Sequence, residues 1–397
     1  MTFHGPLGGK NADTKKQILS LCISDDWSIA ELSKELSTSI PTITKLVGEL
    51  IEENYLEDMG KHGTTGGRRP SIFGLNPAAG HLIGVDIGNK EIRLAITDFK
   101  GRVESYTDGI AFTLDNSEES FARLCDIITR TVKQAKVEMS DVISCGVNLS
   151  GRVNSFSGYS LTYMLGEYRP LTEILSSRLG VNVTIENDSR AMTYAEYLTG
   201  CNSTEKNVLF FNVNWGLGMG MIVDGKLHYG KSGFSGEIGH FPMLNNDVIC
   251  RCGKRGCLET GASASAMYRI INERLREGRS SILSDKIKKG KDININDMID
   301  AALAEDVLVI EVIEEIGSTL GQAIAGMIKI FNPEVVIIGG RLSRTKDYLM
   351  LPVKSAINKH SLSFVSQDTA IRLSKLGDKA GAIGACLLTR SKFLQLI

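Results

Sequence analysis

The chain has 397 residues, 42% of them hydrophobic, and a formal net charge of −1 at pH 7. That length suits two or three domains of a globular protein, and the balanced charge excludes both a global basic field and an acidic tail. No apolar run is long enough to span a bilayer, and the first sixteen residues lack the apolar segment of a signal peptide, so we expect a cytoplasmic protein with no membrane partner.

Residues 1–76 predict three short helices followed by a hairpin. Ser28 and Glu31 have the spacing of a capping box that begins the second helix, and a third helix is expected over 40–54. Two helices joined by a short turn are the layout of a helix-turn-helix. The third helix leaves polar residues facing outwards as candidate DNA contacts: Thr42, Thr44 and Lys45.

A glycine-rich segment with two adjacent arginines follows, and it predicts a β-wing. Arg68 and Arg69 suit a narrow minor groove or phosphate contacts. Residues 1–75 hold eight basic and ten acidic side chains, so DNA binding would depend on a local basic edge. A three-helix protein-interaction domain without DNA is the alternative. The expected edge consists of Lys10, Lys15, Lys16, Lys45, Lys61, Arg68 and Arg69.

A second region begins near residue 81 with two strands, over 82–88 and 92–98. The turn that joins them contains Asp86-Ile87-Gly88-Asn89-Lys90. A glycine turn of this kind lets backbone N–H groups approach a phosphate. A later strand over 208–213 leads into a second glycine-rich run, Asn214-Trp215-Gly216-Leu217-Gly218. The sequence therefore offers two candidate phosphate loops.

Two further strands end in polar loops. Residues 142–149 lead into Ser150-Gly151-Arg152, and residues 181–185 lead into Glu186-Asn187-Asp188 with a helix expected over 189–198. Asp188 could serve as the N-cap of that helix, because aspartate is favoured at this position. Downstream, the polar interval 278–296 is expected to be a surface excursion between helices.

His240, Cys250, Cys252 and Cys257 supply three thiolates and one imidazole at zinc-ligand spacing. A closed Cys3His site is structural, because it leaves no position for a reactive water. Glu237 and Glu259 bring carboxylates into the same small volume. The alternative, three cysteines that merely pack, fits the spacing poorly. The remaining five cysteines are expected to be reduced core thiols.

The run Gly-Glu-Ile-Gly-His followed by Cys-x-Cys-Gly-x-x-Gly-Cys-Leu-Glu resembles the signature of the ROK family, which groups sugar-responsive repressors with sugar kinases. The Gly-Gly-Arg-Arg-Pro segment resembles that of its regulators, and the resemblance covers essentially the whole chain. It implies a winged helix-turn-helix over 1–76 and an α/β two-lobed, actin/hexokinase-like (ribonuclease H-like) body with a structural zinc site. Lobe 1 would span 80–198, with the C-terminal helix 377–397 packing back on it, and lobe 2 would span 199–376.

The resemblance also implies functional residues. His240 would bridge zinc and sugar, and Asp188 would act as a catalytic base only if kinase activity is retained. The implied sugar contacts are Gly151, Asn187, Asp188, Glu237, His240 and Glu259.

Both candidate phosphate loops depart from the family's kinases. Asn89 and Lys90 stand where the kinases have glycine and threonine, and Trp215 stands where they have a second threonine. Asp86, Gly88, Gly216 and Gly218 are retained. An indole cannot replace a hydroxyl–phosphate contact, so the pattern favours a body that binds sugar without phosphorylating it.

We therefore expect a sugar-responsive repressor that binds operator DNA, a sugar or sugar phosphate, and structural Zn2+. It would act as a homodimer or a dimer of dimers, because palindromic operators pair with two-fold dimers. The alternative is an ATP/Mg2+-dependent sugar kinase that retains a DNA-binding domain. Under a third hypothesis, Lys90 holds the phosphate of a sugar phosphate effector.

Overall fold

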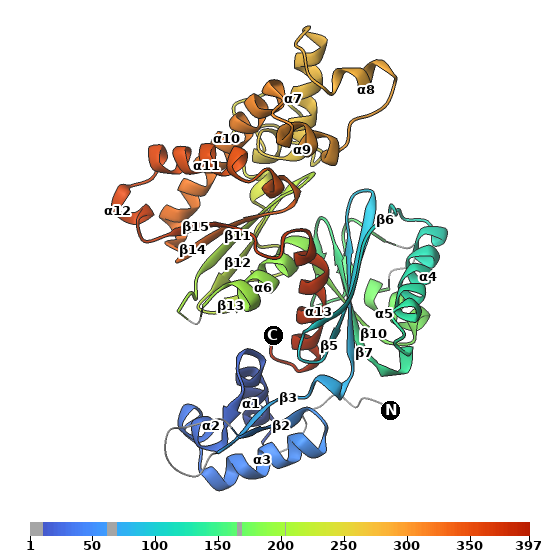
Figure 1. Cartoon of the computed structure of the whole chain (residues 1–397), viewed down its shortest axis with the longest axis vertical. Coiled ribbons are helices and arrows are strands. Elements are labelled where there is room, and N and C mark those ends of the chain that lie inside the picture. Colours follow the sequence, from blue (N-terminus) through green and yellow to red (C-terminus); the bar gives the residue numbers. More distant parts are fainter. Residues whose placement is uncertain (1–10, 62–69, 165–168, 203) are drawn as a thin grey trace. The chain divides into compact units, whose positions relative to one another are not determined.

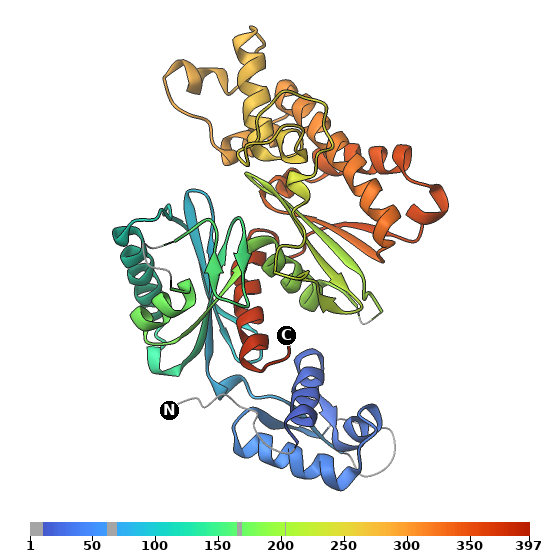
Figure 2. The ribbon, with the colours of Figure 1, turned by 180° about the vertical axis from the view of Figure 1, so that it is seen from behind.

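The structure is a computed structural model that describes residues 11–61, 70–164, 169–202 and 204–397. Contacts within the chain define two compact units (Figures 1 and 2). The first comprises Met1–Asp188 and Gly381–Ile397, and the second comprises Ser189–Ala380. The domain limits expected from the sequence stay predictions. None of the helices in the described ranges combines the length and the apolar composition that crossing a bilayer requires.

The first unit begins with three helices and a small antiparallel sheet, in which β3 pairs with both β1 and β2. The predicted capping box is confirmed, because Ser28 and Glu31 exchange hydrogen bonds at the start of α2. The third helix ends at Glu52, two residues earlier than predicted, because Asn54 has a left-handed φ of 65°. The elements are α1 (Ala12–Ser24), β1 (Trp27–Ser28), α2 (Ile29–Glu35), α3 (Ile40–Glu52), β2 (Leu56–Lys61) and β3 (Ser71–Leu75).

A five-stranded sheet forms the rest of this unit, in the order β10-β7-β4-β5-β6. Its strands are β4 (His81–Ile87), β5 (Glu91–Asp98), β6 (Val103–Ala111), β7 (Val142–Leu149) and β10 (Asn182–Asn187). Helices α4 (Glu118–Gln134) and α5 (Leu171–Leu179) cover one face, and α13 (Ala380–Phe393) covers the other (Figure 1). Strand β7 is buried along its whole length, as expected for a strand between two helical layers. A two-stranded hairpin, β8 (Val153–Asn154) and β9 (Tyr159–Ser160), follows β7.

The second unit repeats this topology. Counted in chain order, the strands of both five-stranded sheets lie in the order fifth, fourth, first, second, third, which is the duplication expected of an actin/hexokinase-like body. The strands are β11 (Val208–Val213), β12 (Leu217–Val223), β13 (Lys226–Leu227), β14 (Val335–Gly339) and β15 (Ala370–Leu373). Helix α6 (Asp188–Gly200) covers one face, and α10 (Val307–Phe331) with α11 (Asp347–His360) covers the other (Figures 1 and 2).

The described residues of the second unit form four further α-helices: α7 (Ala264–Arg276), α8 (Ser284–Lys288), α9 (Ile295–Leu303) and α12 (Ser363–Ser366). The interval 278–296 is therefore more ordered than a simple surface excursion, because it contains α8 and the start of α9. Asn294 and Asp297 form a second capping box there, and Ile293 is buried. A capping box and one buried apolar side chain are enough to fold a polar segment locally.

Helix α13 approaches its sheet so closely that glycine is required on the facing strands. A Cβ on Gly84 of β4 would lie 1.9 Å from the carbonyl oxygen of Ala382, and one on Gly146 of β7 would lie 2.4 Å from that of Ala385. Farther along α13, the buried Arg390 donates to the carbonyl oxygens of Phe99 and Lys100, at 3.3 and 2.7 Å. The C-terminal helix is thus an integral part of the first unit.

Loops that flank the N-terminal helices contact the same turn between β5 and β6. Lys100 donates to Asp26 at 2.7 Å, and the ring of Tyr55 lies 5.9 Å from that of Phe99 and 6.3 Å from that of Phe393. One turn therefore joins the helical segment, the first sheet and the C-terminal helix.

Gly84→Ala is expected to lower the free energy of unfolding by about 3 kcal/mol, because the added methyl group meets a backbone carbonyl that cannot turn aside. Gly48→Ala in α3 is the matched control. A Cβ there meets no atom within 4 Å, so alanine should raise stability by about 0.5 kcal/mol or more. Urea unfolding followed by circular dichroism measures both. A Gly84→Ala protein with the midpoint of the unsubstituted chain would contradict the packing described here.

Candidate functional site

His240, Cys250, Cys252 and Cys257 converge in the second unit, with their ligand atoms within 4.8 Å of one another. Cys250 Sγ lies 3.5 Å from His240 Nδ1, and Cys252 Sγ lies 3.6 Å from Cys257 Sγ. Two sulfurs bound to one tetrahedral zinc at 2.3 Å would be about 3.8 Å apart. The donor set and its spacing therefore fit a tetrahedral metal ion.

The loop around this cluster folds through glycines and short backbone hydrogen bonds. Gly253 and Gly256 have positive φ values of 84° and 76°, and a Cβ on Gly256 would lie 2.6 Å from the carbonyl oxygen of Leu244. The amide of Cys250 donates to the carbonyl of Lys254 at 2.8 Å. These constraints bring cysteines on both sides of one tight turn to a common point.

The surroundings shift the pKa values of the three thiols in different directions. Hydrogen bonding to the backbone of Lys254 lowers the pKa of Cys252, whereas burial raises the pKa of Cys250 and raises that of Cys257 to about 12. A thiol must lose its proton to bind a metal, so any metal affinity here would fall as the pH falls.

Two carboxylates flank the cluster as the sequence predicted. Glu237 Oε2 lies 3.9 Å from His240 Nε2, the ring nitrogen that points away from the cysteines. Glu259 is buried, accepts a hydrogen bond from the amide of Leu217 at 3.0 Å, and approaches Cys250 Sγ at 4.0 Å. Its carboxylate thus joins the metal loop to the turn before β12.

The remaining predicted sugar contacts lie in the first unit. Asn187, at the end of β10, donates from Nδ2 to the carbonyl oxygen of Gly151 at 3.0 Å. Strands β7 and β10 are parallel neighbours, so the loops that follow them meet at one edge of the sheet. Asp188 begins α6 beside them. Gly151 has a φ of 87°, and a Cβ there would lie 2.4 Å from Thr162 Oγ1. Each unit therefore assembles its own set of three predicted sugar contacts.

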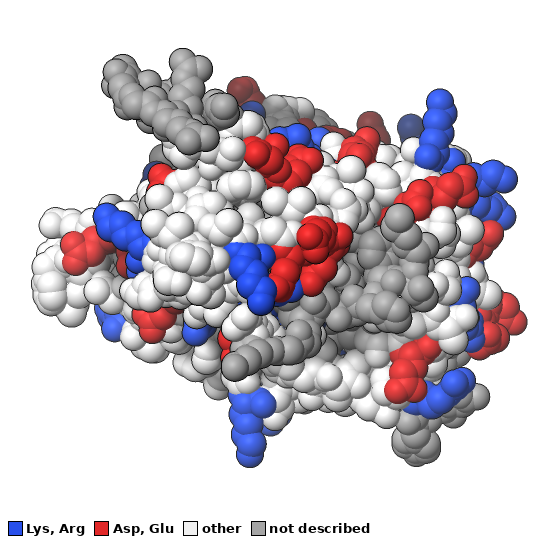
Figure 3. Space-filling view, turned by 90° about the horizontal axis from the view of Figure 1, so that it is seen from below, with Lys and Arg blue, Asp and Glu red and all other residues white. Residues whose placement is uncertain are grey.

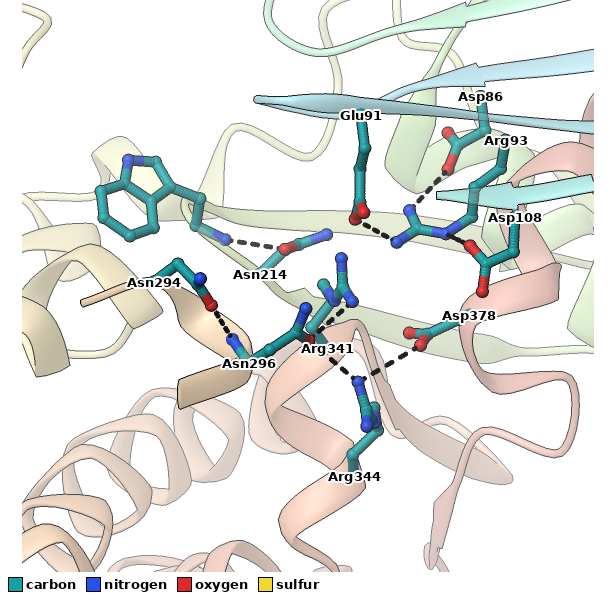
Figure 4. Close-up of polar contacts among 11 residues, drawn as sticks. Asp86, Glu91, Arg93, Asp108, Asn214, Asn294, Asn296, Arg341, Arg344 and Asp378 are labelled. Carbon is teal, nitrogen blue, oxygen red and sulfur yellow. Dashed lines mark hydrogen bonds and ion pairs between the residues drawn. The ribbon is translucent and has the colours of Figure 1, made fainter. Parts of the chain in front are cut away.

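The first candidate phosphate loop adjoins an arginine that the sequence did not single out. Arg93 of β5 is buried and pairs with three carboxylates: Asp86 at 3.9 Å, Asp108 at 2.8 Å and Glu91 (Figure 4). Within the loop, the amide of Gly88 already donates to the carbonyl of Glu91 at 2.9 Å. Three carboxylates around one guanidinium leave this corner negatively charged, which opposes phosphate binding. A charged residue between the apolar Ile92 and Leu94 was the only signal in the sequence.

The second candidate phosphate loop is mostly a strand. Residues from Leu217 onwards belong to β12, and the turn before it is only three residues long. The glycine at 218 makes room for α6, because a Cβ there would lie 2.2 Å from Ser189 Oγ. A Cβ on Gly216 would lie 2.6 Å from Glu259 Oε2. These glycines thus have packing reasons to be retained that are independent of any phosphate.

The candidate DNA contacts of α3 differ in their environments. Thr44 and Lys45 are exposed, whereas Thr42 is half-buried and its hydroxyl lies 2.8 Å from the capping Ser39 Oγ. Lys15 does not contribute to the expected basic edge, because it is buried and bonds Glu49 and Glu53. Arg68 and Arg69 lie outside the described residues. Among the described residues, the face in Figure 3 mixes acidic and basic side chains without a continuous basic field.

Comparison with known proteins places these features in a family. Residues 82–392 match the ROK family model. The chain is 29% identical over 376 residues to a xylose repressor of Caldicellulosiruptor bescii, covering 93% of this chain and 92% of the repressor. It is also 29% identical over 313 residues to a glucokinase of Halalkalibacterium halodurans, covering 78% of this chain and 95% of the kinase.

Among solved structures, a ROK family transcriptional regulator described as a homolog of the E. coli MLC protein superimposes with a TM-score of 0.80, at 28% identity and 96% coverage of both chains. This agreement confirms the predicted two-lobed, sugar-kinase-like fold. The family match covers most of the chain and includes the cysteine loop and both duplicated sheets. The chain belongs to the ROK family.

Proposed function

We propose that this chain is a sugar-responsive transcriptional repressor. The observation that carries the proposal is the extent of the sequence similarity. The similarity to the xylose repressor covers 93% of this chain, whereas the similarity to the glucokinase covers 78%. The family model itself begins at residue 82. The helices and small sheet that precede it are the part that a regulator needs and a kinase does not.

In this proposal the N-terminal segment is a winged helix-turn-helix that binds operator DNA. Helix α3 would enter the major groove with Thr44 and Lys45 towards the bases, and Thr42 would contribute through its position at the start of the helix. Arg68 and Arg69 would contact the minor groove or phosphates. Pairing across a homodimer, or a dimer of dimers, would supply the two half-sites.

The ROK body would bind the sugar through Gly151, Asn187, Asp188, Glu237, His240 and Glu259. The four-residue cluster would hold a structural Zn2+, with His240 Nδ1 on the metal side. His240 Nε2 faces Glu237 and would be available to a sugar hydroxyl. The metal would serve to pose the histidine and both glutamates.

The body contacts the DNA-binding segment through the turn between β5 and β6. Arg390 of α13 holds the carbonyls of this turn, and Lys100 within it pairs with Asp26 beside the helices. A sugar-dependent shift of α13 would therefore reach the loop between α1 and β1 through the buried Arg390 contact and the partly buried Lys100–Asp26 ion pair. This route supports a repressor whose DNA affinity changes with sugar.

The first test exposes purified protein to free sugars and sugar phosphates, each with and without magnesium-ATP, and records the melting temperature. A ligand at one hundred times its Kd stabilises the fold by about 2.7 kcal/mol. We expect one sugar to raise the melting temperature, ATP to add nothing, and no phosphorylated product to form. ATP-dependent stabilisation together with a phosphorylated sugar would establish the kinase alternative.

Cys252→Ala is expected to reduce bound zinc from about one ion per chain to a small fraction, and to weaken sugar binding at least tenfold, because the metal poses His240 and Glu259. Cys201→Ala, at a thiol outside the cluster, is the matched control and should keep both. Elemental analysis and titration calorimetry measure the two effects. Unchanged sugar affinity in a zinc-free variant would show that the metal does not organise the site.

Replacing Arg68 and Arg69 together with alanine should weaken binding to the operator, here a duplex selected from a random library by the unsubstituted protein. The slope of log affinity against log salt should fall by about two per protomer, and so by about four for a homodimer, if both arginines contact phosphates. Lys354→Ala with Lys359→Ala on α11 removes the same charge elsewhere and serves as the control. Sugar affinity should be unchanged in both. If the two double variants bind the operator with equal affinity, the wing does not contact the DNA.

A further inference from the structure

A hollow of about 250 Å³ lies within the second unit, directly beside the metal cluster. Trp215 forms one wall, the metal loop around Arg251 forms another, and the N-terminal half of α7 with Ser265 and Arg269 forms a third. Of the proposed sugar contacts, Glu259 also lines it. A ligand held at Glu259 would therefore have an adjoining space into which a substituent can extend.

The indole of Trp215 is a fixed apolar wall of this hollow. Its ring lies 5.7 Å from that of Tyr268, and hydrogen bonds hold its backbone on both sides. The amide donates to Asn214 Oδ1 at 2.9 Å, and the carbonyl accepts from the amide of Ser265 at 3.1 Å. A half-buried aromatic ring backed by another and anchored at its backbone loses little conformational freedom when a ligand packs on it.

Hydroxyl and carboxylate groups complete the lining. Ser263 Oγ donates to the carbonyl oxygen of Glu259 at 2.7 Å, so in its 2.8 Å contact with Ser265 the proton comes from Ser265. The oxygen of Ser265 then retains acceptor capacity towards the hollow. The guanidinium of Arg251, 3.5 Å from Glu259, adds donors at the rim. Donors and acceptors therefore surround an apolar face.

The charges of the hollow cancel in pairs. Arg269 makes two 3.0 Å hydrogen bonds to Glu273, and Arg251 faces Glu259. The Glu259 carboxylate also lines the hollow and would repel an anion. Because both guanidiniums already face carboxylates, the hollow favours a neutral polyhydroxylated ligand.

We propose that this hollow is a second sugar subsite, so that the effector is a neutral disaccharide or glycoside. One ring would occupy the proposed site at His240 and Glu259, and the next ring would pack its C–H face on Trp215. The volume is slightly below the 300–1,000 Å³ of drug-sized pockets, which suits one pyranose ring. Trp215, which replaces the threonine of the family's kinases, would thus supply the surface on which the second sugar ring packs. This inference rests on the proposed sugar-binding function.

Titration calorimetry on the full-length, zinc-loaded chain tests the subsite. The probes are xylose with xylobiose, glucose with cellobiose, and N-acetylglucosamine with its β-1,4 dimer, together with glucose 6-phosphate and N-acetylglucosamine 6-phosphate. We expect one disaccharide to bind at least tenfold more tightly than its own monosaccharide. Trp215→Ala should abolish that gain and leave the monosaccharide affinity within twofold, and Trp215→Phe should restore most of it.

Phe364→Ala, at an aromatic residue of α12 that is 70% exposed and outside the hollow, is the matched control and should behave as the unsubstituted protein. Retained monosaccharide affinity shows that each variant is folded. A monosaccharide that binds as tightly as its disaccharide would overturn the subsite and leave the proposed function intact. So would a sugar phosphate that binds tightest and is unaffected by Trp215→Ala. No binding to any probe would count against the proposed function as well.

Discussion

The buried carboxylate of Glu259 is the interaction on which the proposed site depends. It lies at the end of the metal loop, approaches Cys250, accepts the amide of Leu217 and borders the hollow beside Trp215. A buried carboxylate is stable only when hydrogen bonds and nearby charge compensate its lost hydration. The turn before β12 and Arg251 provide that compensation, so the cysteine loop, the glycine turn and the hollow are one connected structure.

The two loops that resemble phosphate loops both make internal contacts that would compete with a phosphate. In the first unit, the guanidinium of Arg93 is already shared among carboxylates. In the second, an internal carboxylate takes the amide that an anion would use. The glycines persist because helices and side chains pack against their bare Cα atoms. The glycines of these loops therefore have packing roles that do not depend on catalysis.

The turn between β5 and β6 connects separate parts of the first unit. Residues from the start, the middle and the end of the chain meet there: Asp26, Lys100 and Arg390. Buried arginine–carbonyl bonds and clustered aromatic rings resist small displacements. We therefore expect α13 and this turn to move together or not at all. Such a joint suits a protein in which a body that binds a small molecule regulates a separate segment that binds DNA.

Local patterns in the sequence were sufficient for the metal cluster, the capping box of α2, most strands and the family itself, because each depends on residues within a few positions of one another. Partners distant in the chain were not predictable in this way. The burial of Lys15 by Glu49 and Glu53, the carboxylates around Arg93 and the walls around Trp215 each join segments that no periodicity connects. Only the tertiary structure decided these contacts, because the energy of a buried charge or a stacked ring depends on neighbours that the fold alone supplies.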